Sequence, residues 1–129
     1  MRFQQHLKLH EAVLKHPDIP ANNQNGTCYQ DAMKYMMSHS TDRGLMLCHG
    51  LVTGQGDIEG VIYNHAWVEK GNKVIDETIP ITVDKRVYYA IGNISEKNVY
   101  RYTHNEMNEK VVEFKTYGPW EKKLINNKY

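Results

Sequence analysis

Three residues whose types act together in nucleophilic catalysis fall in three short segments of the chain. They are Cys28 in NGTCYQDAMKYM, His65 in NHAWVE and Asp76 in KVIDET. A deprotonated thiol attacks a carbonyl carbon, an imidazole accepts the thiol proton, and a carboxylate orients the imidazole and stabilises its positive charge. The three segments therefore predict a Cys-His-Asp set that reacts through a thioester.

The cysteine is expected at the start of a helix that runs from about Cys28 to Ser38. A helix N-terminus presents partial positive charge and free N–H groups, which stabilise a thiolate there. An oxyanion hole needs further donors. The backbone N–H of Cys28 is one candidate, and a side-chain amide of Asn23, Gln24 or Asn25 is the other.

The histidine and the aspartate are expected on two strands joined by a tight hairpin. A two-residue loop at 70–71 places His65 directly opposite Asp76, where Cβ atoms lie about 4.5–5.5 Å apart. This register is the one we favour. A loop at 71–72 instead places Asp76 opposite Trp67 and leaves a diagonal contact with His65.

Hydrophobic periodicity and turn residues predict an α+β protein. Ala32, Met33, Met36 and Met37 should bury the cysteine helix on more than one side, and Cys48 should be a core residue in mid-strand. The expected elements are a helix at 3–15, a loop at 16–26, a helix at 28–38, strands at 45–54, 61–69 and 73–81 with a glycine-rich turn at 55–60, a strand or short helix at 86–94, a strand followed by a helix within 98–114, a turn at 117–120 and a frayed terminus at 121–129.

Composition limits the classes of function. The 129 residues fit one domain, and a net charge of +1 implies no long-range attraction to nucleic acid or to anionic membranes. Two cysteines, no signal-peptide pattern and no apolar run of roughly 18 residues favour a cytoplasmic protein. The histidines and cysteines lack the CxxC and HExxH spacings of zinc sites, so we expect no metal.

Each of the three residues also has a structural explanation when taken alone. A free cysteine on a methionine-rich helix is often a core residue, and strand histidines are often structural. Asp76 could simply precede a turn, because Pro80 is near. It is their order, spacing and expected secondary structure in combination that favour catalysis.

Three segments resemble the core of transglutaminase-like proteins, within the papain-like cysteine peptidase superfamily. NGTCYQDAMKYM, LMLCHGLVTGQG and NHAWVEKGNKVIDET carry the resemblance, over about residues 25–80. Tyr29 stands where animal transglutaminases carry tryptophan, and Asp-Glu-Thr replaces their common Asp-Pro-Thr. These departures and the short chain point to a small bacterial or phage-type member rather than to a protein cross-linking enzyme.

The resemblance implies a single transglutaminase-like domain over 1–129, with a papain-like core in which N-terminal helices pack on an antiparallel β-sheet. It makes Cys28 the nucleophile, His65 the base and Asp76 the orienting acid, and we count Trp67 of the His-Ala-Trp-Val-Glu motif among the substrate-binding residues. The implied activity is a cysteine-dependent amide-bond hydrolase or acyltransferase, of peptidase, deamidase or transglutaminase type. It would act on a protein or peptide without a cofactor. Two alternatives stay open, a non-catalytic protein-binding module on the same fold and a small modulator of a host protein.

Overall fold

A computed structural model describes residues 27–77 and 82–127 of the chain. The expected helix at 3–15 and loop at 16–26 lie outside the described residues, as do Asn23, Gln24 and Asn25. Within the described residues, no helix is long and apolar enough to cross a membrane.

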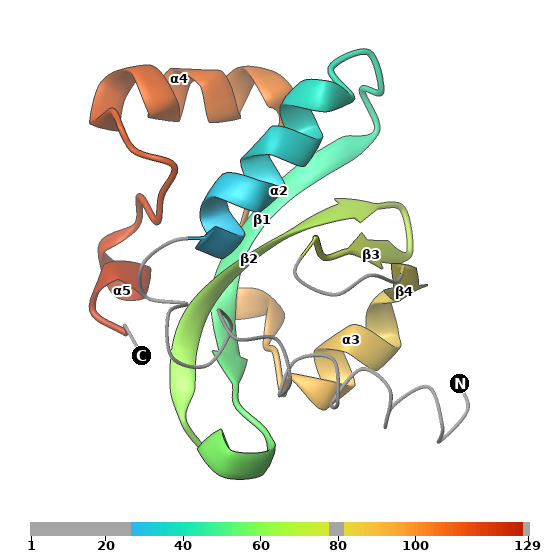
Figure 1. Ribbon diagram of the computed structural model, residues 1–129, viewed down its shortest axis with the longest axis vertical. Coiled ribbons are helices and arrows are strands. Elements are labelled where there is room, and N and C mark those ends of the chain that lie inside the picture. Colours follow the sequence, from blue (N-terminus) through green and yellow to red (C-terminus); the bar gives the residue numbers. More distant parts are fainter. Residues whose placement is uncertain (1–26, 78–81, 128–129) are drawn as a thin grey trace.

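Five antiparallel strands form one sheet in the order β4-β3-β2-β1-β5, so the expected α+β class with an antiparallel sheet is confirmed. The long strands β1 and β2 form the centre, and Figure 1 shows both curving beneath helix α2. The strands are β1 Leu45–Thr53, β2 Ile62–Lys70, β3 Lys73–Ile75, β4 Thr82–Asp84 and β5 Val99–Tyr102.

Helices cover both faces of this sheet. Helix α2 packs on β1 and β2 from one side, together with α4, and α3 packs on β3 and β4. The helices are α2 Thr27–Ser38, α3 Lys85–Ile91, α4 His104–Phe114 and α5 Lys122–Ile125, with short 3-10 turns at Gly56–Ile58 and Glu96–Asn98. Asp84 caps α3 by accepting from the Arg86 backbone N–H, which explains why the ambiguous segment at 86–94 begins as a helix.

The expected helix at 28–38 is confirmed, and its buried side chains form the core on one side of the sheet. Ala32, Met33 and Met36 are buried as expected, but Met37 is 59% exposed, so its expected burial is wrong. Cys48 is fully buried in mid-strand, as expected.

The expected frayed terminus is wrong for residues 122–127. Helix α5 buries Leu124 completely, and the backbone of Asn127 accepts a hydrogen bond from the Asn64 backbone N–H at 2.9 Å. The polar composition of this segment concealed a single apolar residue that anchors it. Because Asn64 precedes His65 on β2, the segment lies against the strand that carries the histidine.

The turn between β2 and β3 falls at residues 71–72, so the favoured loop at 70–71 is wrong. Gly71 takes the first turn position with a φ of +57°, a backbone conformation that glycine adopts without steric cost. A loop at 70–71 would put Lys70 in that position, where its Cβ would be strained. The glycine therefore decides the register of the hairpin.

Candidate active site

Cys28 is the second residue of α2, and its side chain is only 1% exposed. Its backbone N–H belongs to the first turn of the helix, where N–H groups have no partner within the helix. These free donors and the helix dipole favour a negative charge at this position. The structure thus places Cys28 in the first turn of the helix, as expected from the sequence.

His65 and Asp76 form a buried hydrogen-bonded pair. His65 Nε2 lies 2.8 Å from Asp76 Oδ2, and the two side chains are 6% and 2% exposed. In the observed register, Asp76 follows the last paired residue of β3 and lies diagonally from His65 rather than opposite it. The expected contact is therefore present, although it forms through the diagonal geometry that we did not favour.

The charge state of His65 is set by its two acidic neighbours. Burial alone would lower its pKa, but the charge of Asp76, followed by that of Cys28, raises the pKa to about 10. The hydrogen bond with Asp76 contributes in the same direction. At neutral pH the ring is therefore an imidazolium, and its positive charge balances the negative charge of the Asp76 carboxylate.

The two ring nitrogens of His65 have different surroundings. Nε2 is occupied by Asp76, whereas Nδ1 is buried and makes no regular hydrogen bond to any other described residue. Because Cys28 raises the pKa of this ring, Nδ1 is the nitrogen left to interact with the thiol. A carboxylate on one nitrogen, with the other nitrogen left for a thiol, is the arrangement that thiol activation requires.

Tyr88 of α3 extends the His65–Asp76 pair to a group of three side chains, and the sequence did not reveal this residue. Its hydroxyl donates to Asp76 Oδ2 at 2.5 Å, the same oxygen that His65 contacts. Burial, and then the charge of Asp76, raises the pKa of Tyr88 well above its ordinary value, so the phenol remains a donor. Tyr88 thus fixes the carboxylate that fixes the imidazole.

Trp67 lies two residues after His65 on β2, on the same face of the sheet, and is fully buried. The two rings stack at an angle of 27°, with centroids 6.1 Å apart. The indole N–H donates to Glu69 Oε2 at 3.0 Å, so this donor already has a partner inside the protein. In this position Trp67 supports the imidazole ring by packing against it.

Glu69 anchors this layer through a set of donors on the same face of the sheet. Its carboxylate accepts from Trp67, from the Tyr89 hydroxyl and from Arg101 Nε at 2.8 Å, and Lys85 Nζ lies 3.6 Å away. Burial raises the pKa of Glu69, but Arg101 and then Trp67 outweigh it, and the pKa falls below its ordinary value. The result is a satisfied buried carboxylate that holds Trp67 in place.

A buried hydrogen bond joins the segment that carries Cys28 to the segment that carries His65. The Tyr29 hydroxyl donates to Asn64 Oδ1 at 2.8 Å, which joins the residue after Cys28 to the residue before His65. Asn64 Nδ2 donates in turn to the Leu124 carbonyl at 2.7 Å. The C-terminal segment therefore helps to hold the cysteine helix against the histidine strand. A tyrosine after Cys28 and an asparagine before His65 were the only sequence signals of this link.

Gly50 of β1 pairs with His65 across the sheet and leaves the space that Trp67 fills. A Cβ at this position would lie 2.8 Å from Trp67 Cη2, closer than side chains tolerate. We expect Gly50→Ala to shift the indole and destabilise the protein by about 1–3 kcal/mol, as overpacked cores do. Urea unfolding measures this loss. Gly44→Ala is the matched control, because a Cβ at Gly44 would have Asp42 Oδ1 as its nearest neighbour, at an ordinary contact distance of 3.5 Å. Equal losses of stability in both variants would contradict the close packing at Gly50.

Other groups that bind metals or act as nucleophiles do not form a second site in the described ranges. No group of three or more His, Cys, Asp or Glu side chains lies close enough there to hold a metal ion. Burial, and then the charge of Glu69, raises the pKa of Cys48 well above its ordinary value. The raised pKa keeps the Cys48 thiol protonated at neutral pH, which disfavours a role as a nucleophile.

Comparisons with protein-family models, with curated proteins and with solved structures found no match to this chain. The roles of Cys28, His65 and Asp76 must therefore be inferred from residue chemistry and geometry. The structure brings His65 and Asp76 into hydrogen-bond contact and couples His65 electrostatically to Cys28.

Proposed function

We propose that this protein is a cysteine-dependent amide-bond hydrolase or acyltransferase that forms a thioester on Cys28. The observation that carries the proposal is the position of His65, which hydrogen-bonds Asp76 at 2.8 Å and is coupled to Cys28 through its raised pKa. A buried imidazolium between a carboxylate and a thiol supports nucleophilic catalysis better than a purely structural role.

The proposed reaction has two steps. The Cys28 thiolate attacks the carbonyl carbon of an amide, and His65 donates its Nδ1 proton to the departing amine as the thioester forms. Water or a second amine then attacks the thioester, His65 accepts the proton of that nucleophile, and the thiolate leaves. Asp76 keeps His65 in the required orientation throughout. The oxyanion would be held by the Cys28 backbone N–H and by a side-chain amide of Asn23, Gln24 or Asn25.

The proposal extends to a papain-like, transglutaminase-like core for this chain. Its support is the cysteine at the start of a helix that packs on an antiparallel sheet, with the histidine on the neighbouring strand. A protein or peptide is the proposed substrate, because the resemblance is to enzymes that act on amide bonds.

One observation favours the alternative of a non-catalytic binding module. Cys28, His65 and Asp76 are 1%, 5% and 2% exposed, so all three side chains are almost closed to solvent in this conformation. An active enzyme must therefore open at the site, whereas a binding module need not.

Thiol reactivity distinguishes the two. We expect iodoacetamide at pH 6.5 to alkylate Cys28 faster than a free model thiol, and His65→Ala to abolish that advantage. Peptide mass spectrometry resolves the two cysteines, and buried Cys48 in the same molecule should remain unlabelled while the protein is folded. Labelling of Cys28 no faster than the model thiol would leave the binding module as the better explanation.

A further inference from the structure

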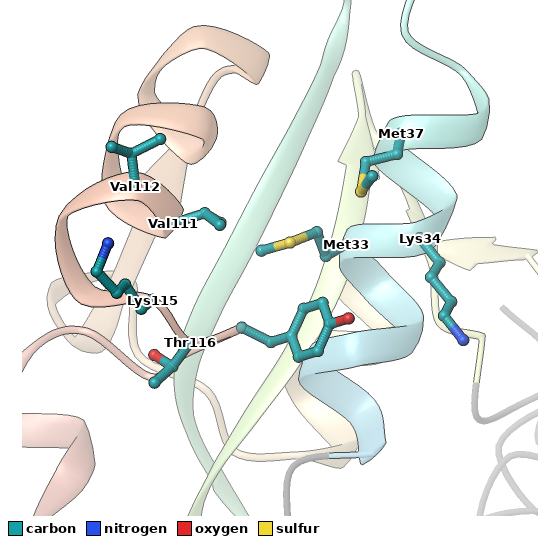
Figure 2. Close-up of a pocket in the computed structure, with 8 residues that line it drawn as sticks. Met33, Lys34, Met37, Val111, Val112, Lys115 and Thr116 are labelled. Carbon is teal, nitrogen blue, oxygen red and sulfur yellow. The ribbon is translucent and has the colours of Figure 1, made fainter.

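A groove with a volume of about 660 Å³ runs between α2 and α4, away from the proposed active site (Figure 2). Met33 and Met37 line it from α2, Val111 and Val112 from α4, and Tyr117 from the segment that follows. Met37, Val112 and Tyr117 are 59%, 73% and 43% exposed, which is high for large apolar side chains. Contiguous exposed apolar surface of this kind marks interaction sites.

The groove lies on the flank of α2 opposite to Cys28. At about 100° per residue, Met33 and Met37 lie roughly 140–180° around the helix from Cys28. Figure 2 shows both methionines directed toward α4 and the Thr116 segment. A molecule in the groove would therefore not occupy the site around Cys28, and it would contact a separate surface of the protein.

The two charged side chains that line the groove within residues 27–77 and 82–127 are both positive. Lys34 lies on the α2 side and Lys115 follows the end of α4, and none of the described lining residues is acidic. On α4, Glu109 and Glu113 are turned roughly 110–150° from the lining face, by the same helical geometry. Figure 2 shows the Lys34 side chain directed away from α4, so its charge lies at the rim of the groove. An apolar channel with positive charge at its rim is electrostatically complementary to an apolar segment that carries carboxylates at its edges.

We propose that the α2–α4 groove docks an acidic, amphipathic peptide segment of a partner protein. Apolar side chains of the segment would enter between the two methionines and two valines, and its carboxylates would pair with Lys34 and Lys115. Grooves of this kind between helices bind amphipathic helices elsewhere, and methionine side chains adapt readily to such partners. The concave shape favours a peptide over a flat lipid surface. This docking role does not depend on the proposed reaction at Cys28.

Selection from a random 12-residue peptide library on the immobilised full-length protein tests the proposal. We expect the selected peptides to alternate Asp or Glu with Leu, Ile or Phe. Fluorescence anisotropy should show at least tenfold weaker binding to the double variant Lys34→Glu/Lys115→Glu, and weaker binding to Met37→Gln. Lys73→Glu/Lys97→Glu is the matched control, because it makes the same charge change at exposed lysines outside the groove and should bind as the wild type does.

Three results would overturn the proposal. One is a selected set without acidic enrichment, and another is a set that binds the Lys34→Glu/Lys115→Glu variant as tightly as the wild type. The third is preference for another occupant, seen as self-association in ultracentrifugation that is lost in Met37→Gln, or as tighter binding to phosphatidylserine vesicles than to any selected peptide. Circular dichroism of each variant confirms that the fold is retained, so weaker binding can be assigned to the groove.

Discussion

Asp76→Asn is expected to slow iodoacetamide labelling of Cys28 at pH 6.5 by up to about 10²-fold, because a thiol with the ordinary pKa of about 8.5 is only about 1% thiolate at that pH. Without the charge of Asp76, burial dominates and the pKa of His65 falls from about 10. The imidazole then becomes neutral near pH 7 and no longer stabilises a thiolate. Alkylation reactions quenched at successive times and analysed by peptide mass spectrometry measure the rate.

The same variant should lose about 3–5 kcal/mol of stability, as expected when one member of a buried ion pair is removed. The pKa of His65 is raised in the folded state, so the stability from its pairing is fully present below the unfolded pKa of about 6.5 and is lost as the pH rises toward 10. Urea unfolding should therefore show the largest gap between wild type and variant near pH 6.5 and a smaller gap near pH 10.

Asp42→Asn is the control for this experiment. Asp42 also pairs with a cation, Lys70 Nζ at 2.7 Å, but both side chains of that pair are accessible to solvent. Removing the exposed pair should change stability little and leave Cys28 labelling unaltered. A pH-independent gap for Asp76→Asn, or equal effects of both variants on labelling, would contradict the proposed role of Asp76.

His49→Leu is expected to make the protein more resistant to acid. His49 is fully buried among the rings of Tyr29, Tyr102 and Trp120, and neither of its ring nitrogens has a hydrogen-bond partner in the described part of the chain. Burial, and then the charge of His65, lowers the pKa of His49 to about 3. Protonating this ring in the folded protein is therefore unfavourable.

The sign of the effect follows from linkage. Below its unfolded pKa of about 6.5, the unfolded chain binds a proton at His49 that the folded chain does not, so stability is present above that pH and falls as the pH decreases. Between pH 6.5 and 4 the loss amounts to about 3 kcal/mol at about 1.36 kcal/mol per pKa unit. Leucine has a similar volume and no titratable group, so the variant should lack this part of the acid loss.

Urea midpoints measured from pH 8 to pH 4 provide the measurement. We expect wild type and His49→Leu to differ little at pH 8 and to diverge steadily below pH 6.5. His39→Gln is the control, because His39 is exposed in the turn that follows α2 and its replacement should leave the loss of stability at acid pH unchanged. Parallel curves for wild type and His49→Leu would show that His49 is protonated in the folded protein or is hydrated there.

Local sequence patterns were sufficient where neighbouring residues decide the structure. The apolar residues of 28–38 predicted α2, and the apolar segments bounded by glycines predicted β1 and β2 almost to their ends. The hairpin was expected from Gly71, but its register was wrong because we weighed the facing of His65 and Asp76 above the φ requirement of the glycine. The helix at Lys85–Ile91 was left open because its residues suit a strand as well as a helix, and the Asp84 cap decides between them.

By itself, the sequence determined which groups are candidates for the proposed chemistry and which short elements carry them, because the order Cys28, His65, Asp76 and the local periodicity are both encoded within a few residues of each position. The tertiary structure alone decided how those groups are held. Tyr88 reaches Asp76 only because α3 packs behind β3, and Asn64 joins Tyr29 to the C-terminal segment only because residues far apart along the chain meet at β2. Such contacts depend on the packing of whole elements, and no local pattern records them. The same packing buries the His49 ring nitrogens without a hydrogen-bond partner among the described residues, and it leaves Met33 and Met37 of α2 facing a groove.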